Sequence, residues 1–167
     1  MLGWWRCIGR SLTDGRNMES AAIQLREAEQ FFHSRIPLTH TMGLRVVGSD
    51  DDSFIVEAPV ALNSNHLETA FGGSINAVAT LAGYGLLWLE LREAAASIVI
   101  RESSIRFLHP IRQTIRAICE RPTPEELGAF RRALQTRGKA RIVLHVRCEE
   151  NSRVAADFKG TFVAITG

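Results

Sequence analysis

An almost continuous apolar segment from Ser74 to Leu91 constrains the fold more than any other feature of the 167-residue sequence. The segment approaches the length of a membrane span, but glycines and three polar residues interrupt it. Asn76, Thr80 and Tyr84 recur at every fourth position, which places them on one face of a helix. The segment therefore predicts a long buried helix whose polar stripe is either satisfied within the core or lines a cavity.

The loop that leads into this helix ends in two glycines, Gly72 and Gly73. Glycines at a helix start let another molecule approach the backbone, and the first free N–H groups carry the positive end of the helix dipole. This arrangement predicts an oxyanion site. The alternative is an ordinary turn into a core helix.

Length and composition predict one globular domain. The chain is 46% hydrophobic with a formal net charge of +2, so its bulk charge does not indicate a nucleic acid or a membrane as partner. The cysteines, Cys7, Cys119 and Cys148, lack paired spacing and are expected to be small buried residues in a reducing cytoplasm. The five histidines lack metal-binding spacing, so we expect no metal.

The beginning of the chain is expected to differ from the rest. Residues 1–18 are predicted to be disordered or adventitious, because they lack the apolar run of a signal peptide and contain Met18, a second possible start. The single domain is expected to span residues 19–167. It opens with an amphipathic helix from Glu19 to Arg35, which Pro37 ends.

Strand-like segments flank the central helix. Residues 43–48 and 53–60 surround an acidic turn and predict a hairpin. Residues 97–108 and 114–120 are rich in β-branched side chains and predict a second antiparallel pair.

The last third of the sequence predicts a short helix and two long strands. Thr123 opens the helix with a capping box and Gly138 closes it. Residues 142–148 and 156–164 alternate between apolar and polar side chains and meet at a turn. The predicted fold is thus α+β: an antiparallel sheet of about six strands wraps around a long central helix, with an N-terminal helix and a short helix between the fourth and fifth strands.

Two motifs resemble a known superfamily. The loop from Asn65 to Gly73 matches the pattern N-x-x-x-T-A-x-G-G of the phenylacetyl-CoA thioesterase-like branch of the hotdog-fold thioesterases, and residues 105–110 (IRFLHP) resemble its strand I-S-F-L-x-P. The segment TAFGGS, followed by LAGYGLLW, is most similar to a putative-thioesterase family found alone or fused behind an acetyltransferase domain. Members of that family are implicated as malonyl-ACP decarboxylases. The resemblance covers roughly residues 38–167.

The resemblance implies a hotdog fold that pairs into a homodimer or a dimer of dimers, with sites formed between subunits. It implies acyl thioesters of ACP or CoA as substrates, with phosphopantetheine as part of the substrate and no separate cofactor. A nucleic acid or a membrane is not expected as partner.

The chain departs from the hydrolytic relatives at two positions. They carry histidine where this chain has Phe71, and a catalytic aspartate on the helix where this chain has Thr80. Without that carboxylate, an attacking water has no evident general base, and His66 is the nearby substitute. The alternative is that His66 is an exposed loop histidine.

Loss of carbon dioxide from a malonyl thioester needs donors for the enolate oxygen but no external base. We therefore favour decarboxylation of malonyl-ACP to acetyl-ACP at the start of fatty acid synthesis. The rivals are a thioesterase, using His66 or a carboxylate of the partner subunit, and a silent binding module for acyl thioesters. The expected catalytic residues are Asn65, His66, Gly72, Gly73, Thr80 and Tyr84.

Substrate binding is expected from the helix start and from a basic cluster. Phe71 would form an apolar wall, and the cluster near the short helix would bind an acidic carrier protein or the phosphates of CoA. The alternative for the cluster is a solvated basic face. The expected binding residues are Phe71, Ser74, Asn76, Arg131, Arg137, Lys139 and Arg141.

Overall fold

The computed structural model describes residues 11–166, which form one antiparallel sheet around a central helix. Two short segments are 3₁₀ turns, Val60–Leu62 and Arg92–Ala94. The elements in chain order are α1 (Ser11–Arg35), α2 (Pro37–Thr41), β1 (Arg45–Ser49), β2 (Ser53–Pro59), α3 (Gly72–Glu90), β3 (Ser97–Phe107), β4 (Thr114–Glu120), α4 (Pro124–Arg137), β5 (Lys139–Glu150) and β6 (Arg153–Ile165).

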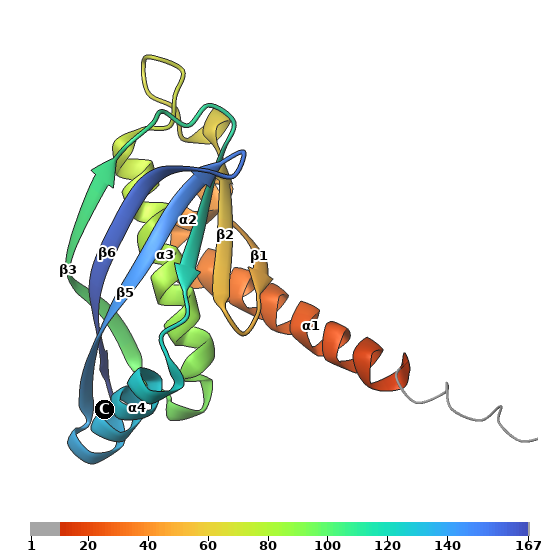
Figure 1. The fold of residues 1–167 in the computed structure, drawn as a ribbon, viewed down its shortest axis with the longest axis vertical. Coiled ribbons are helices and arrows are strands. Elements are labelled where there is room, and N and C mark those ends of the chain that lie inside the picture. Colours follow the sequence, from red (N-terminus) through yellow and green to blue (C-terminus); the bar gives the residue numbers. More distant parts are fainter. Residues whose placement is uncertain (1–10, 167) are drawn as a thin grey trace, which may run out of the picture.

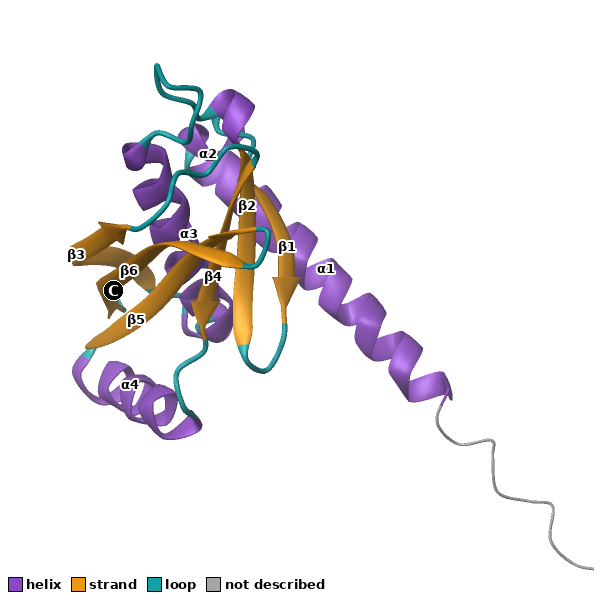
Figure 2. Cartoon of the chain, turned by 45° about the horizontal axis from the view of Figure 1, so that its top comes forward, coloured by secondary structure: helices purple, strands orange, loops and turns teal. Residues whose placement is uncertain are grey.

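The strand order in the sheet is β1-β2-β4-β5-β6-β3, and all neighbours are antiparallel. The sheet curves around α3, while α4 lies at one end of the sheet and α1 extends away from the β1 edge (Figure 1). Figure 2 shows α3 cupped by the strands, with a cluster of loops at one end of the sheet. This arrangement confirms the predicted α+β architecture of six strands and a central helix.

The central helix is buried where small residues let the sheet approach it. The ring of Phe162 packs against Gly83, and the ring of Phe54 packs against Gly85, at distances that leave no room for a Cβ. Both phenylalanines are fully buried. The predicted long buried helix is therefore confirmed, and it begins two residues earlier than Ser74, at Gly72.

Strands β5 and β6 form the longest hairpin of the sheet. Asn151 and Ser152 connect the strands with positive φ values of 50° and 62°, which match the twist of a tight hairpin. Alternate residues of β5 point to opposite faces: Leu144 is buried against α3, whereas Val143 is exposed on the outer face. The predicted pair of long strands is confirmed.

The short helix α4 is present between the two capping residues that predicted it, Thr123 and Gly138. The Thr123 hydroxyl accepts a hydrogen bond from the Glu126 N–H, and the Glu126 carboxylate accepts one from the Thr123 N–H. Gly138 ends the helix in the left-handed region with φ 64°, where a residue with a side chain would be strained. The predicted β1–β2 hairpin is present as well.

The predicted pairing of the strands at residues 97–108 and 114–120 is wrong. Strand β3 pairs with β6, and β4 lies between β2 and β5, so the two strands stand on opposite sides of the β5–β6 hairpin. The prediction followed nearness in sequence, whereas β3 pairs along almost its whole length with the distant strand β6.

The N-terminal helix is longer than predicted. It begins at Ser11 instead of Glu19, so residues 11–18, part of the segment expected to be disordered or adventitious, are helical. The same expectation for residues 1–10 lies outside the described residues. Pro37 does end α1, but it also begins the short helix α2, because its fixed φ suits the first helical position.

Two of the cysteines are buried on the inner face of neighbouring strands. Cys119 and Cys148 are fully buried free thiols, as expected, while Cys7 lies outside the described residues. Burial raises the pKa of each thiol to about 12. A separate finding concerns the described helices: each one is too short or too polar to cross a membrane.

Candidate active site at the start of the central helix

The first turn of α3 is left without a side-chain cap. Phe71 occupies the N-cap position and its side chain offers no acceptor. The first helical hydrogen bond runs from the Ile75 N–H to the Phe71 carbonyl oxygen at 3.0 Å. The preceding N–H groups, of Gly72, Gly73 and Ser74, are therefore free for an external acceptor, at the positive end of the helix dipole.

Two aromatic rings flank the paired glycines. The ring of Phe71 lies over Gly73 so closely that a Cβ at Gly73 would overlap it. On the neighbouring side, a Cβ at Gly72 would lie only 3.3 Å from Cζ of Phe107. Both rings are 55% exposed, so they form a rim on the surface and are not part of the core.

A pocket of about 290 Å³ opens beside Gly72. One side consists of Ala70, Gly72 and Ile75, and the other is the end of β3 and the turn after it, from Phe107 to Pro110. Apolar groups dominate the lining, and His109 is its one titratable side chain. A site of this kind can hold a small acyl group against free backbone N–H groups.

His109 was not among the predicted site residues. Its ring lies next to Arg153, whose Nη2 is 2.8 Å from Nε2 and 3.0 Å from Nδ1, so the guanidinium donates to a ring nitrogen. The sequence signal for His109 is the segment IRFLHP, which contains both Phe107 and His109. In the sequence analysis this segment indicated a family strand but no site residue. The fold brings this segment to α3 because β3 runs back along the helix.

Asn63 anchors the loop that delivers the glycines. Its side chain is buried and donates from Nδ2 to the carbonyl oxygens of Met42 (2.9 Å) and Pro59 (2.8 Å). Its own carbonyl oxygen accepts from the Phe71 N–H at 2.8 Å. These bonds fix the backbone just before the helix start, a positioning role that the sequence pattern did not reveal.

Asn65 folds the tip of the same loop. Its Oδ1 accepts from the Leu67 N–H at 2.8 Å, and its Nδ2 donates to Thr69 Oγ1 at 3.1 Å. Glu68, between them, adopts φ 57°. In this structure the amide of Asn65 therefore holds the turn together and does not lie in the pocket, where it was expected to act as a donor.

His66 is exposed at the tip of this loop and does not line the pocket. This matches the alternative considered for it, a solvated loop histidine. His109, unlike His66, lines the pocket beside Gly72.

The polar stripe of α3 is half-buried and runs away from the pocket. Thr80 Oγ1 donates back to the Asn76 carbonyl oxygen at 2.9 Å. Thr80 and Tyr84 lie about 12 and 18 Å along the helix axis from Gly72, given a rise of 1.5 Å per residue. Neither these two residues nor Ser74 and Asn76 line the pocket of the same protomer.

Tyr84 belongs to an aromatic cluster between α1 and α3. Its ring stacks on that of Phe31 at a centroid distance of 6.3 Å, and the ring of Trp88 stacks on Phe31 at 5.0 Å. Burial raises the pKa of the Tyr84 hydroxyl. Within one protomer, Tyr84 is thus a packing residue and does not reach a substrate at Gly72.

The predicted basic cluster divides into two parts. Arg131 pairs with Glu90, which also pairs with Arg121, so the Arg131 guanidinium is held in an ion pair away from the other three cations. The other three, Arg137, Lys139 and Arg141, line a groove on the outer face of the sheet. For a metal, the described residues bring together no group of three histidine, cysteine or carboxylate side chains.

Residues 25–166 match the profile of a family described as putative thioesterase (yiiD_Cterm). A protein of unknown function from Chlorobaculum tepidum TLS is 31% identical, with a TM-score of 0.80 over 85% of this chain and 94% of that chain. A putative thioesterase from Shewanella oneidensis is 28% identical, with a TM-score of 0.78 over 87% and 99%. A probable thioesterase from Pseudomonas aeruginosa, at 22% identity, shares the fold with a TM-score of 0.74 over 85% and 95%.

Proposed function

We propose a reaction for this site from the premise that the chain belongs to the putative thioesterase (yiiD_Cterm) family and has its hotdog fold. The chain acts as an enzyme on acyl thioesters. The observation that carries this proposal is the uncapped start of α3 at Gly72 and Gly73, which opens beside a small apolar pocket. Free N–H groups at a helix start stabilise the negative charge that a thioester oxygen gains during reaction.

The favoured reaction is decarboxylation of malonyl-ACP to acetyl-ACP. The bond between the methylene carbon and the carboxylate carbon breaks, and its electron pair moves into the thioester to form an enolate. The amides of Gly72 and Gly73 bind the enolate oxygen, and a proton added to the methylene carbon completes the acetyl group. No carboxylate lines the pocket, so no like charge repels the substrate's own carboxylate.

His109 is the group that supports a proton-transfer step. It lines the pocket from the side opposite Gly72, where it can deliver a proton to the enolate carbon directly or through a water. The same position would suit a general base for water, so His109 also supports the rival reaction, hydrolysis of an acyl thioester. Asn65 is then a positioning residue, which holds the loop in place.

We also propose that two protomers pair through β3. This strand is at the free edge of the sheet, and Ile100 on its inner face, opposite Phe162, is still 37% exposed. An exposed apolar edge strand is a template for a second strand. A second copy would cover this edge together with the half-buried face of α3, and it could bring Thr80 or Tyr84 of the partner toward the pocket. Two such dimers would pair into a dimer of dimers through a surface other than the β3 edge.

The cytoplasm is the location that we propose. Cys119 and Cys148 are free thiols, which a reducing compartment preserves. The substrates named above, acyl groups on ACP or CoA, are consistent with the same compartment.

Product analysis tests the reaction. The purified protein is incubated with malonyl-ACP and separately with malonyl-CoA, and mass spectrometry follows the acetyl thioester and the free thiol. Acetyl thioester without free thiol is the expected result, and free thiol would replace decarboxylation with hydrolysis. If neither product forms at stoichiometric enzyme, the chain is a binding module and the catalytic proposal is overturned.

A further inference from the structure

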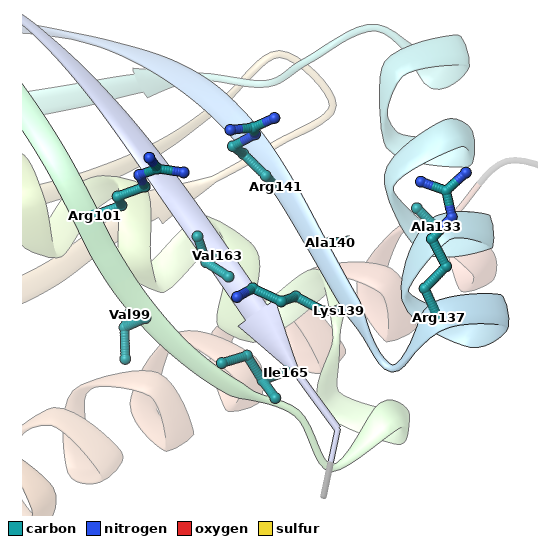
Figure 3. Close-up of a pocket in the computed structure, with 9 residues that line it drawn as sticks. All are labelled: Val99, Arg101, Ala133, Arg137, Lys139, Ala140, Arg141, Val163 and Ile165. Atoms are coloured by element: carbon teal, nitrogen blue, oxygen red, sulfur yellow. The ribbon is translucent and has the colours of Figure 1, made fainter.

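A second cavity lies on the outer face of the sheet, far from the start of α3. It has a volume of about 730 Å³ and is formed by β3, β5, β6 and the last turns of α4. Val163 and Ile165 of β6 form its floor, with Val99 of β3 beside them. Figure 3 shows Arg101 and Arg141 on the strands that flank β6, Lys139 crossing toward Val163, and Arg137 on α4. We call this cavity the basic groove.

Within residues 11–166, the charges of the basic groove are not neutralised by ion pairs. The described ion pairs include Arg92, Arg106, Arg116, Arg121, Arg131 and Arg147. None of the four cations of the groove takes part in an ion pair among the described residues. Four like charges that face one concave surface repel each other, and an anionic partner would remove that repulsion.

The shape and lining of the groove favour a protein over a nucleotide. Its nine lining residues include no aromatic side chain on which a base could stack. The helix end at the groove is the C-terminus of α4, which lacks the free backbone N–H groups that bind phosphates at helix starts. Aliphatic side chains in the centre and long cations at the rim are instead the composition of a protein interface.

We infer that the basic groove is the docking surface for an acidic carrier protein that presents the acyl thioester, and this inference rests on the proposed function. Carboxylates on one helix of the carrier would pair with Arg101, Arg137, Lys139 and Arg141, and aliphatic side chains of that helix would cover Val163 and Ile165. Arg131, which the sequence analysis grouped with Arg137, Lys139 and Arg141, takes no part because it pairs with Glu90.

The position of the groove suits a substrate carried on a long arm. Strand β3 joins the two sites, with Arg101 in the groove and Phe107 at the pocket. These residues are six positions apart, or about 20 Å along a strand. A carrier seated in the groove therefore reaches the pocket only through an extended flexible group, such as the prosthetic arm of a carrier protein.

Binding without chemistry tests the inference. The full chain is titrated with a holo-acyl carrier protein that carries no acyl group, and the heat of binding is measured. The double variant Lys139→Glu/Arg141→Glu is expected to weaken binding by at least about tenfold, since like charges would then face each other. The control variant Arg45→Glu reverses an exposed charge on β1, at the far edge of the sheet, and is expected to change binding by less than about twofold.

Two further measurements distinguish binding of an acidic carrier protein from binding of the phosphates of free CoA. Raising the ionic strength from about 0.05 to about 0.3 M is expected to weaken carrier binding. Free CoA is expected not to displace the carrier. Displacement by CoA, or unchanged binding by the double variant, would overturn the inference. Because this experiment measures binding and not turnover, failure of the proposed reaction would not change its result. Turnover of malonyl-CoA without carrier binding would refute the docking role of the groove and leave the proposed reaction standing.

Discussion

The aromatic ring of Phe71 lies directly over Gly73, where even a methyl group would overlap it. We predict that Gly73→Ala lowers turnover by at least about tenfold, since the methyl group and the displaced ring would obstruct the free N–H groups. The fold should tolerate the change, because the overlapping atoms belong to an exposed side chain and alanine favours the helix. Steady-state kinetics and a thermal melt check both statements. Full activity in this variant would exclude the glycine amides from the reaction.

A second variant identifies the cause of the loss. Gly73→Ala combined with Phe71→Leu keeps the methyl group but removes the ring. Recovery of turnover would assign the loss to the displaced ring, whereas continued loss would assign it to the covered amides.

Matched variants of His109 and His66 compare the histidine that lines the pocket with the histidine that the sequence predicted. His109→Gln is expected to lower kcat by about 100-fold, since a positioned proton donor contributes on that order. His66→Gln is expected to stay within about threefold of the parent, because its side chain is exposed in the loop and lies outside the pocket. Parallel kinetics on malonyl-ACP check the order. A larger loss for His66→Gln would restore the role that the sequence suggested.

The proposed dimer depends on the exposed inner face of β3. Ile100→Asp places a charge where the partner strand would bury it, so sedimentation should show a monomer. Val143→Asp is the control, because Val143 is similarly exposed, at 41% against 37%, but lies on the outer face of β5 inside the sheet. The control should remain a dimer, and a dimeric Ile100→Asp would refute pairing through this edge.

Two glycines within helices should respond in opposite ways to alanine. At Gly85 a Cβ would overlap the buried ring of Phe54, so Gly85→Ala should lower the free energy of unfolding by about 1–3 kcal/mol. At Gly128 in α4 the nearest atom to an added Cβ is Nη1 of the flexible Arg132 at 3.2 Å. Because alanine favours the helix, Gly128→Ala should raise the free energy of unfolding by up to about 1 kcal/mol. Urea denaturation measures both, and equal effects would contradict the packing of α3 described above.

The buried thiols make stability fall at alkaline pH. Burial raises the pKa of Cys119 and Cys148 from 9.0 to about 12, so between these values the folded state keeps protons that the unfolded state releases. The free energy of unfolding should therefore decrease with pH in this range, by up to about 1.4 kcal/mol per pH unit for each thiol. Tyr84 acts in the same direction. A Cys119→Ala/Cys148→Ala variant isolates the thiols, and its stability should fall less steeply in urea titrations at about pH 9 to 11.

The elements that the sequence predicted well carry their signals locally. The capping box at Thr123 and the closing glycine at Gly138 act within one helix, and the alternation along β5 and β6 needs only a period of two. The pairing of β3 carries no such signal. Its partner residues lie at least 49 positions away, the separation of Phe107 and Ala156, so nearness in sequence favoured β4.

The residues of the candidate site fall into the same two groups, those with a local sequence signal and those that depend on long-range pairing. Gly72 and Gly73 were predictable because a helix start is a local feature. His109 and Arg101 were missed because each becomes important only through β3: one lies beyond its end, next to α3, and the other stands at the bulge between Ile100 and Glu102. Tyr84 was assigned to the site through its face on the helix, but its distance along the axis separates it from Gly72 within one protomer.

The order of strands in the sheet has a consequence for synthesis on the ribosome. Strand β3 has one hydrogen-bonded neighbour in the described chain, β6, which is translated after the other five strands of this sheet. Both edges of β3, with its exposed Val99 and Ile100, are therefore unpaired while residues 108–165 are being made. A nascent chain halted in that interval presents an apolar strand that is open on both sides, and completion of β6 covers one of these two edges.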